Sequence, residues 1–279
     1  MNPIWLEETV RRSLHEDIGY GDLTTEAIVP SSSEARGKIV AKAAGRIAGI
    51  EVAMLTFQLL EPNVEMTVDA PDGTDVKPGD TVLHLRGPAA SVLLGERVAL
   101  NFLQRLSGIA SATALAVEAV APYATRIVDT RKTTPGLRAL EKYAVRVGGG
   151  FNHRLGLDDA VLIKDNHLAV AGGISEAVRR VRERIGHLVK IEVEVETLAQ
   201  VDEALAARVD TIMLDNMDPE TMREAVIRID RRALVEASGN IRIEHIATVA
   251  ATGVDIISMG WLTHSAPVLD LSLRLQLTH

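Results

Sequence analysis

Basic side chains that could bind an anion are concentrated between Arg126 and His167. This stretch contains 8 Lys and Arg against 5 Asp and Glu, a net charge of +3, in a chain whose formal net charge is −8. Two short apolar runs inside it break directly into Asp129-Thr130-Arg131-Lys132 and Lys164-Asp165-Asn166-His167. Positive charge at the ends of buried segments favours a site for a strongly anionic ligand, because a charge held partly out of water needs a counter-charge. For any single residue of the stretch, a solvated surface position is an equally good explanation.

Acidic and small residues follow the later apolar runs. Glu194 and Asp215 end two neighbouring runs and could accept hydrogen bonds from sugar hydroxyls or hold a divalent cation. Ser238-Gly239-Asn240 and Ser258-Met259-Gly260 end the last two runs, where small residues let backbone N–H groups approach a phosphate. The residues alone therefore predict a phosphate site, carboxylates and a basic cluster around one ligand, as suits a phosphorylated sugar that reacts with an acidic partner.

Other chemistries fit these residues less well. His153 and His167 lack the HExxH spacing of a zinc site. Lys164 could form a Schiff base, but the cations nearby and Asp165 favour pairing with an anion instead. Gly148-Gly149-Gly150 is not followed by Gly-Lys-Ser/Thr, so it predicts a turn and not a phosphate-binding P-loop.

Repeated strand–helix units must position the candidate residues. After Pro122, apolar strand candidates recur and each is followed by a helical pattern, which indicates parallel strands in an open sheet or a closed barrel. Polar residues end every strand candidate, which favours a barrel with its active face at the carboxyl ends of the strands. The expected strands are 127–128, 161–163, 189–195, 211–214, 233–235 and 254–257, with helices at 175–184, 198–207, 219–229 and 244–252. Six strands would make a shortened barrel.

The first hundred residues have a different pattern. Strand-like runs at 38–43, 64–68 and 81–85 are separated by turn signals, and 50–60 fits a helix packed on the resulting antiparallel sheet. Residues 4–14 have helical spacing, and 16–25 reads as a structured loop. Two helices are expected next, at 91–106 and 111–120, with a break at Ser107-Gly108. The fold class is therefore α/β, with a small N-terminal α+β unit before a shortened barrel.

Composition limits the possible partners and surroundings. The chain has 279 residues, enough for one large domain or two smaller ones, and 47% of them are hydrophobic. The acidic balance and an aromatic content of 3% give no reason to expect nucleic acid. No apolar run approaches membrane-spanning length, and the N-terminus meets charge too early for a signal peptide. The absence of cysteine excludes disulfides and thiolate catalysis, so a cytoplasmic protein is expected.

Nearly end to end, the sequence resembles the quinolinate phosphoribosyltransferases, the nicotinate-nucleotide pyrophosphorylases (carboxylating) of NAD synthesis. The motifs that carry the resemblance are Glu16-Asp17 with Gly21 to Thr25, Glu96 to Asn101 with Leu106 to Ala110, Asp129 to Pro135, Gly148 to Arg154, Ile163 to His167, Glu192 to Glu194, Leu214 to Asn216, Glu236 to Asn240, and Gly260 with Leu262 to Ser265. The resemblance implies an N-terminal α/β sandwich over 1–110, joined by a C-terminal helix over 266–279, and an incomplete α/β barrel over 111–265. It also implies homodimers or larger homo-oligomers with shared active sites.

The resemblance assigns roles position by position. The substrates would be quinolinate and phosphoribosyl pyrophosphate, with Mg²⁺ accompanying the second; Glu194 and Asp215 would contact the ribose hydroxyls and Mg²⁺. Lys164, Glu194 and Asp215 would be the catalytic residues. Arg131, His153, Arg154 and Lys164 would hold the two carboxylates of quinolinate, Lys132 would reach toward the phosphates, Arg97 would enter from a neighbouring copy, and Ser238, Gly239, Asn240, Ser258 and Gly260 would take the 5-phosphate.

Some features depart from the family or leave other functions open. Asn240 and Met259 to Trp261 lie at positions that vary in the family, so the backbone donors to the phosphate are not fixed. The competing functions are a paralogue with another acceptor, such as the molybdenum-transport-associated relatives, a Schiff-base aldolase, and a non-catalytic sensor of phosphorylated sugars.

Overall fold

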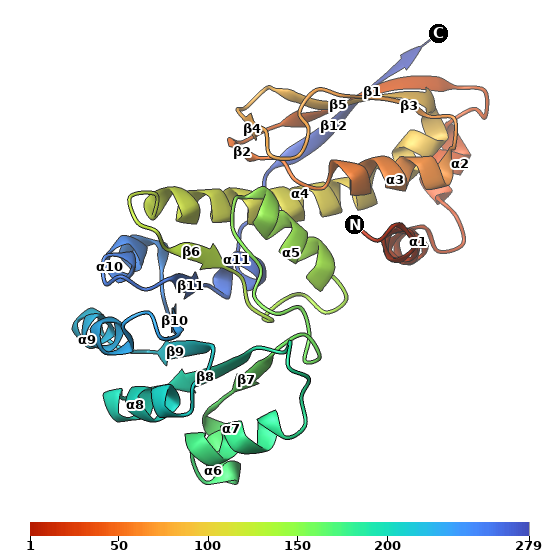
Figure 1. The fold of residues 1–279 in the computed structure, drawn as a ribbon. Helices are drawn as coiled ribbons and strands as arrows, with labels where there is room; N and C mark the ends of the chain where they lie inside the picture. The colour runs from red at the N-terminus through yellow and green to blue at the C-terminus, as the bar shows by residue number, and fades with distance from the viewer. Residues whose placement is uncertain (279) are drawn as a thin grey trace. The chain divides into compact units, whose positions relative to one another are not determined.

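The structure, a computed structural model, describes residues 1–278 and consists of two compact units. Residues 1–112 and the segment from Ala266 onward form the first unit, and residues 113–265 form the second. The boundary between them falls within α4 (Ala89–Ala119). Figure 1 gives the order of the elements along the chain.

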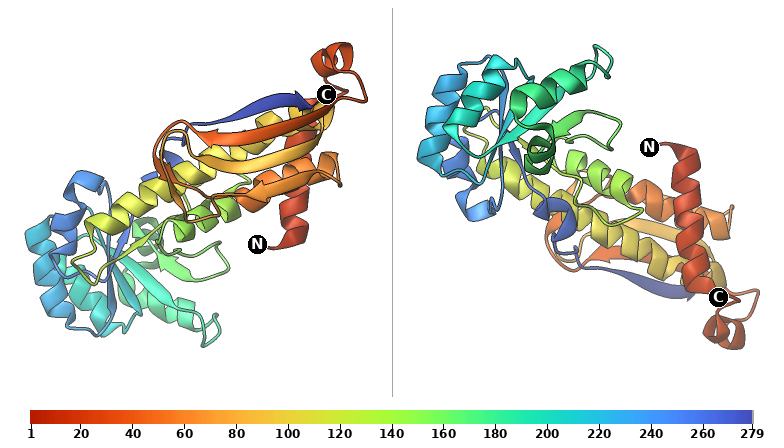
Figure 2. Two further views of the ribbon diagram at one scale, coloured as in Figure 1. Left: turned by 90° about the horizontal axis from the view of Figure 1, so that it is seen from above. Right: turned by 90° about the horizontal axis from the view of Figure 1, so that it is seen from below.

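The first unit is built on an antiparallel sheet with the strand order β12-β1-β5-β3 (Figure 2). Alternate side chains of β1 point into the core, and α3 and α4 cover this face with apolar side chains such as Phe57 and Leu103. The expected helix over 50–60 and the three expected strands are confirmed. The sheet elements are β1 (Glu34–Ala41), β3 (Glu65–Val68), β5 (Thr81–Pro88), β12 (Leu271–Thr278) and the covering helix α3 (Ile50–Leu60).

Side-chain caps define the N-terminal helices. Asn2 caps α1 (Pro3–Ile18), and Asp22 caps α2 (Leu23–Ile28) by accepting hydrogen bonds from the N–H groups of Thr24 and Thr25. The segment expected as a loop over 16–25 is therefore helical at both ends. A short antiparallel pair, β2 (Gly45–Arg46) with β4 (Asp75–Val76), completes the first unit.

The expected C-terminal helix over 266–279 is wrong. Residues Leu271–Thr278 form β12, which pairs antiparallel with β1. The sequence Leu-Ser-Leu-Arg-Leu-Gln-Leu alternates with period 2, which suits a half-buried strand and cannot give a helix an apolar stripe. Leu269 and Leu271 belong to the core of the first unit, and Leu273 and Leu275 pack against it.

The expected break at Ser107-Gly108 is also wrong, because α4 continues through it. Gly108 lies against the backbone of Pro267, where a Cβ would be 2.0 Å from the Pro267 carbonyl oxygen. The Ser107 hydroxyl accepts from the Ala48 N–H at 3.0 Å. Both small residues serve close packing inside the first unit, and the helix tolerates them.

The second unit contains six parallel strands in the order β6-β11-β10-β9-β8-β7. Among the described residues, no ladder joins β6 to β7, so the barrel is incomplete. The six strands are those expected, apart from shifts of a few residues at their ends: β6 (Arg126–Val128), β7 (Val161–Ile163), β8 (Ile191–Val195), β9 (Thr211–Asp215), β10 (Leu234–Ser238) and β11 (Ile256–Ser258). The fold class predicted from the sequence is confirmed.

Helices α7 to α10 cover the outer side of these strands (Figure 1). Thr197 and Gln200 cap α8 reciprocally, and Asp218 caps α9 before Pro219. The helices of this unit are α5 (Arg138–Val147), α6 (Asp165–Ala171), α7 (Ile174–Arg182), α8 (Leu198–Ala206), α9 (Pro219–Ile229), the 3₁₀ turn η1 (Ile243–His245), α10 (Ile246–Ala250) and α11 (Trp261–His264). Of the described residues, no helix is both long and apolar enough to span a membrane.

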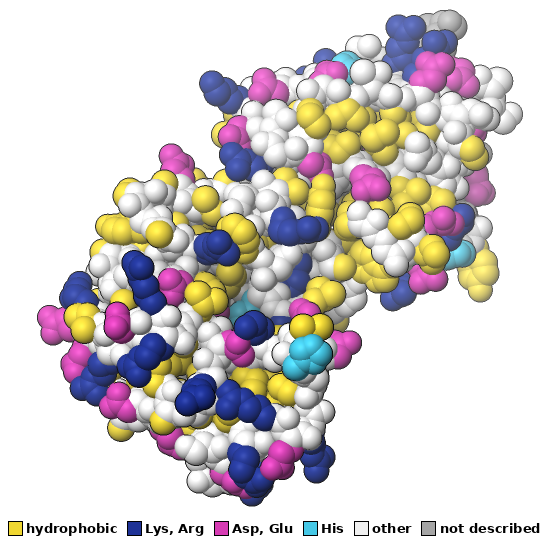
Figure 3. Space-filling view, viewed as in Figure 1, with side chains coloured by type: hydrophobic (Ala, Val, Ile, Leu, Met, Phe, Trp, Pro, Cys, Tyr) yellow, Lys and Arg dark blue, Asp and Glu magenta, His cyan; other side chains and the backbone are white. Residues whose placement is uncertain are grey.

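Charges on the outer helices are largely balanced. Figure 3 shows Lys and Arg side chains interspersed with Asp and Glu on the face of the second unit that it presents. Arg179 and Arg180 pair with Glu176 on α7, and Arg228 of α9 pairs with Asp202 of α8. Solvent-exposed ion pairs of this kind are ordinary surface features and contribute little to stability.

Candidate active site

The carboxyl ends of the parallel strands surround a cavity of about 1050 Å³ in the second unit. All the site residues expected from the sequence line it, with one exception: Arg131, Lys132, His153, Arg154, Lys164, Glu194, Asp215, Ser238, Gly239, Asn240, Ser258 and Gly260. The exception, Arg97, is exposed on α4 in the first unit. One cavity therefore brings together basic, acidic and small residues from every strand end of the barrel.

Two arginines in this cavity have hydrogen-bond donors that the protein does not use. The Nε atoms of Arg131 and Arg154 are buried and have no hydrogen-bond partner among the described residues. Burial and the Arg131 charge lower the pKa of Arg154 against the opposing charges of Glu192 and Asp159, although a guanidinium stays charged at any physiological pH. The Nη1 of Arg154 donates to the Ala160 carbonyl at 2.8 Å, which fixes the direction of its side chain. Two adjacent cations with unused buried donors favour binding of an anion.

Lys164 and Glu194 form an ion pair between the ends of the neighbouring strands β7 and β8. The Nζ of Lys164 lies 3.1 Å from Oε2 of Glu194. Lys164 follows β7 directly, and Glu194 points into the barrel from the neighbouring strand. The pair therefore adjoins both the basic side of the cavity and its acidic side.

The turns after β9 and β10 are locked together. Asn216, with φ of 52°, donates from Nδ2 to Oδ2 of Asp215 at 2.6 Å and so holds the carboxylate. Its N–H also donates to the Ser238 carbonyl at 3.1 Å. Gly239 has φ of 91°, and a Cβ there would lie 2.3 Å from Oδ1 of Asn216, so only glycine fits. The small residues at this turn leave the backbone accessible to a ligand.

A second turn with small residues follows β11. The Ser258 hydroxyl is buried and lies beside the carboxyl of Glu236. Gly260 comes next to Lys132, and a Cβ at Gly260 would be 3.0 Å from Cδ of that lysine. The Thr263 hydroxyl donates to the Lys132 carbonyl at 2.8 Å and ties this turn to the one after β6.

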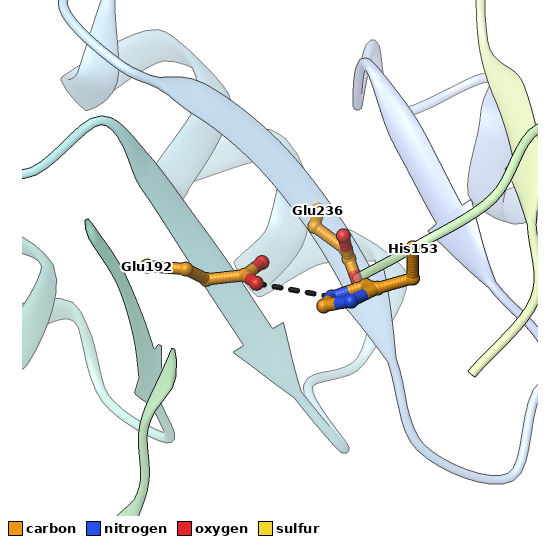
Figure 4. Close-up of side chains that lie close together, drawn as sticks. All are labelled: His153, Glu192 and Glu236. Atoms are coloured by element: carbon orange, nitrogen blue, oxygen red, sulfur yellow. Dashed lines mark ion pairs between the residues drawn. The ribbon is translucent and has the colours of Figure 1, made fainter. Parts of the chain in front are cut away.

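The sequence analysis gave no role to two acidic residues beside His153. Glu192 of β8 and Glu236 of β10 both point toward His153 (Figure 4). The Nε2 of His153 lies 3.0 Å from Oε2 of Glu192 and 3.7 Å from Oε1 of Glu236. The period of a strand could have revealed Glu192, because it is two residues before Glu194 and so shares its face.

These three side chains could be taken for a metal site, but the hydrogen bonds argue against one. The N–H of Arg154 donates to Nδ1 of His153 at 2.8 Å. The imidazole proton is therefore assigned to Nε2, which donates to Glu192 and has no lone pair for a metal. Burial opposes a charged imidazole, but the hydrogen bond and charges of the two glutamates raise the pKa of His153. The Arg154 contact disfavours a second proton on Nδ1, and the neutral tautomer fits the geometry better.

Glu236 is the most buried acid of the site, with 2% of its surface exposed. Burial and the charge of Glu192 raise the pKa of Glu236 to about 8, against the opposing effect of His153. At neutral pH this carboxyl is therefore protonated. Glu194, Asp215 and Glu244 face the cavity without such burial.

Comparison with known protein families identifies the family of the chain. The model of the C-terminal domain of quinolinate phosphoribosyl transferase matches residues 109–274, and the model of its N-terminal domain matches residues 22–107. The chain belongs to the quinolinate phosphoribosyltransferase family.

Individual members of the quinolinate phosphoribosyltransferase family are similar over their whole length. A probable nicotinate-nucleotide pyrophosphorylase (carboxylating) of Bacillus subtilis is 47% identical, over 100% of this chain and 96% of the relative. The corresponding enzyme of Mycobacterium leprae is 44% identical over 96% of each chain. The crystal structure of NadC from Streptococcus pyogenes matches with a TM-score of 0.97 at 44% identity, covering 100% of this chain and 99% of that one. The family expected from the sequence motifs is confirmed.

Proposed function

We propose that the protein transfers the phosphoribosyl group of phosphoribosyl pyrophosphate to quinolinate, giving nicotinate mononucleotide, pyrophosphate and CO₂. The observation that carries the proposal is that Arg131, Arg154 and Lys164 line the same cavity as Glu194 and Asp215. A doubly negative pyridine and an activated ribose need such a combination of cations and acids. Family membership and relatives called nicotinate-nucleotide pyrophosphorylase support the same reaction.

The basic side of the cavity binds quinolinate. Arg131 and Arg154 offer guanidinium groups with unused donors, and Lys164 offers a half-exposed ammonium. Guanidinium donors match the geometry of a carboxylate, so two such residues suit a dicarboxylate. His153 contributes the edge of its ring to the same side.

The small residues at the ends of β10 and β11 suit the 5-phosphate of the ribose. Ser238, Gly239 and Asn240 leave backbone donors accessible, and the hydroxyl of Ser258 lies at the neighbouring turn. Lys132 adjoins Gly260 and can reach the phosphates. In this proposal the ribose lies between the phosphate turns and the carboxylates of Glu194 and Asp215.

Glu194 and Asp215 fit a Mg²⁺ ion, because both offer carboxylate oxygens to the cavity and Asp215 is held in place by Asn216. When bound with phosphoribosyl pyrophosphate, Mg²⁺ supplies neutralisation of the leaving pyrophosphate. The two carboxylates also contact the ribose hydroxyls and favour the positive charge that develops at C1 as pyrophosphate departs.

Cations on the quinolinate side orient the acceptor. The pyridine nitrogen attacks C1, and the cationic ring that results stabilises the carbanion left when the adjacent carboxylate is lost as CO₂. The carbanion then takes a proton from water to give nicotinate mononucleotide. Arg131, Arg154 and Lys164 assist only as far as they favour this transition state over the bound dicarboxylate, since equal stabilisation of both would not speed the step.

A homo-oligomer in which Arg97 completes the site of a neighbouring copy is part of the proposal. Arg97 is exposed on α4, as a residue offered to another copy would be. A cytoplasmic location stays a prediction from the sequence.

The decisive experiment incubates purified protein with quinolinate, phosphoribosyl pyrophosphate and Mg²⁺, and follows CO₂ and nicotinate mononucleotide. Equal amounts of both products are expected. Binding of phosphoribosyl pyrophosphate without release of CO₂ would indicate a sensor, and turnover of a different acceptor would indicate a paralogue. Borohydride trapping of Lys164 with a carbonyl substrate would indicate an aldolase.

A further inference from the structure

A buried ion pair lies next to the cavity but does not line it. Lys142 of α5 and Asp129, which follows β6, are 3% and 0% exposed, and their side chains are in contact. Neither residue can touch a ligand in the cavity. Together they form what is here called the Lys142–Asp129 clamp.

The clamp holds the backbone of His153 from both sides, through the two peptide units that flank its Cα atom. The N–H of His153 donates to Oδ1 of Asp129 at 2.9 Å, and the carbonyl of His153 accepts from Nζ of Lys142 at 2.8 Å. The Nδ2 of Asn152 donates to Oδ2 of Asp129 at 2.6 Å and to the Lys142 carbonyl at 2.8 Å. Both backbone groups of His153 are therefore fixed by charged side chains.

The glycine run before this segment brings it to the clamp. Gly150 packs so closely that a Cβ would be 2.8 Å from Cγ2 of Thr113 and 2.9 Å from Cγ1 of Val145. Phe151 then forms a β-bridge with Val128, the last residue of β6, which sets the path of the next residues. The segment leaves this bridge as irregular backbone, so the clamp replaces the ladder hydrogen bonds that a strand would have.

Fixing the His153 backbone also fixes the side chains that face the ligand. The N–H of Arg154 belongs to the peptide unit whose carbonyl Lys142 holds, and it donates to Nδ1 of His153, so this peptide unit sets the tautomer of the ring. The Nε2–H then points at Glu192, 3.0 Å away. A shift in this peptide unit would move the imidazole and the Cα atom of Arg154 together.

Stability alone is a poor explanation for such a pair. Taking two charges out of water is costly, and a buried ion pair adds little net stability compared with apolar residues of similar volume. Burial raises the pKa of Asp129 and lowers the pKa of Lys142, each opposed by the charge of the other. Removing one partner therefore leaves the other in a place that favours its neutral form.

We propose that Lys142 and Asp129 are positioning residues for the acceptor substrate, because their clamp on the His153 backbone aims His153 and Arg154 into the cavity. This inference rests on the proposed function for the identity of that substrate. Among the described residues, the clamp makes no hydrogen bond or ion pair with Glu194, Asp215 or the phosphate turns, so it acts on quinolinate and not on phosphoribosyl pyrophosphate.

The test compares Lys142→Met with the double variant Asp129→Asn/Lys142→Met in the full-length protein. Lys142→Met leaves the buried carboxylate of Asp129 without its counter-ion and so lowers the denaturation midpoint. The double variant removes both charges and recovers much of that midpoint. The KM for quinolinate rises by up to about 100-fold in both variants, and the KM for phosphoribosyl pyrophosphate stays within about 2-fold of the original value, because a small misplacement of binding groups is costly.

A merely structural pair would behave differently. In that case the KM for quinolinate would return to normal in the double variant as the midpoint recovers, and the proposal would be overturned. A parallel rise in both KM values would overturn it as well.

Lys190→Met is the matched control. Lys190 pairs with Asp210 at 2.5 Å, and Asp210 also accepts from a backbone N–H, that of Ile191 at 2.9 Å. This pair is exposed and adjoins the amino end of β8, away from the strand ends that line the cavity. Its loss leaves both KM values unchanged.

A spectroscopic readout separates this inference from the proposed function. Histidine ¹⁵N chemical shifts, assigned with His153→Asn, report the ring tautomer without any substrate. The unaltered protein shows the Nε2–H tautomer at His153, and the double variant shows a mixture of tautomers. If the protein does not turn over quinolinate but the His153 tautomer differs between the original protein and the double variant, the proposed substrate is wrong. The positioning role of Lys142 and Asp129 is then still supported. An unchanged tautomer in the double variant contradicts the clamp itself.

Discussion

The Lys164 ammonium lies 3.1 Å from the Glu194 carboxylate, and the two residues come from different sides of the candidate active site. Without substrates each is the counter-ion of the other. A carboxylate of quinolinate competes with Glu194 for Lys164, and the ribose and Mg²⁺ compete with Lys164 for Glu194. Binding of either substrate therefore frees a group for the other, so each substrate is expected to tighten the binding of the other.

Lys164→Ala and Arg131→Ala are each expected to reduce kcat/KM for quinolinate by about 100-fold or more, equivalent to about 2.7 kcal/mol of transition-state binding. The reason is that each variant removes a charge-assisted hydrogen bond to a carboxylate. Steady-state assays of CO₂ release measure the effect, with Arg180→Ala on the outer surface of α7 as the control. If either variant still turned over quinolinate at the original rate, the substituted residue would have no role in the reaction.

Chelation of Mg²⁺ should abolish the reaction, and added Mg²⁺ should restore it. Glu194→Gln keeps the size of the side chain but loses the charge, so it should raise the Mg²⁺ concentration needed for half-maximal rate by about 10-fold or more. The measurement is initial rate against Mg²⁺ concentration at fixed substrates. Full activity in excess chelator would show that Glu194 and Asp215 contact only the ribose hydroxyls and do not bind Mg²⁺.

Arg97 offers a test of the shared site. Arg97→Ala and Lys164→Ala should each be inactive as homo-oligomers, for different reasons. Mixing them after gentle dissociation creates hybrid oligomers, in which some sites have both residues intact. About a quarter of the activity should return in a randomly mixed dimer, and the absence of any recovery would argue that each chain builds its own site.

Strand and helix periodicity accounted for most of the fold. The six barrel strands and the helix over 50–60 were predictable, because apolar runs bounded by polar residues leave few alternatives. Gly108 led to the wrong prediction of a helix break, because glycine has a low helix propensity. It is present here because it is the only residue that fits against the Pro267 backbone. The C-terminal strand was missed because the expectation came from a family resemblance, although its own alternating leucines indicate β structure.

The candidate site was predictable where residues end a strand. Arg131, Lys164, Glu194 and Asp215 all follow or end an apolar run, so their convergence in one cavity follows from the parallel sheet. Glu192, Glu236 and Lys142 could not be found this way. They lie inside strands or on a helix, and their importance depends on contacts between segments up to 83 residues apart, as for His153 and Glu236. Asp129 does follow an apolar run, but the strand end alone does not reveal its pairing with Lys142.

The buried carboxyl of Glu236 predicts a pH dependence of stability. Its pKa is about 8 in the folded protein against 4.5 as the ordinary value. A carboxyl that holds its proton more tightly when folded contributes stability that is complete below about pH 4.5 and is lost as the pH rises through about 8. The free energy of unfolding should therefore fall between these values, by at most about 1.4 kcal/mol per pH unit from this group.

Glu236→Gln should flatten that fall, because the amide does not ionise. Urea unfolding at several pH values from 5 to 9 measures the slope, with Glu118→Gln on the exposed face of α4 as the control. A slope that is the same in the Glu236→Gln variant and the original protein would mean that another group titrates.

Gly108→Ala should destabilise the first unit, although alanine is the better helix former. A Cβ at Gly108 would lie 2.0 Å from the Pro267 carbonyl oxygen and 2.9 Å from the Cα of Val268, and neither contact can be relieved by rotating a side chain. Overpacking of this kind costs about 1–3 kcal/mol, against a gain of about 1 kcal/mol or less from helix propensity. Gly186→Ala is the control, because Gly186 has open space around the position of a Cβ. Chemical denaturation should show a lower midpoint for Gly108→Ala alone; equal midpoints for the two variants would mean that the segment after Ala266 does not pack against α4 as described.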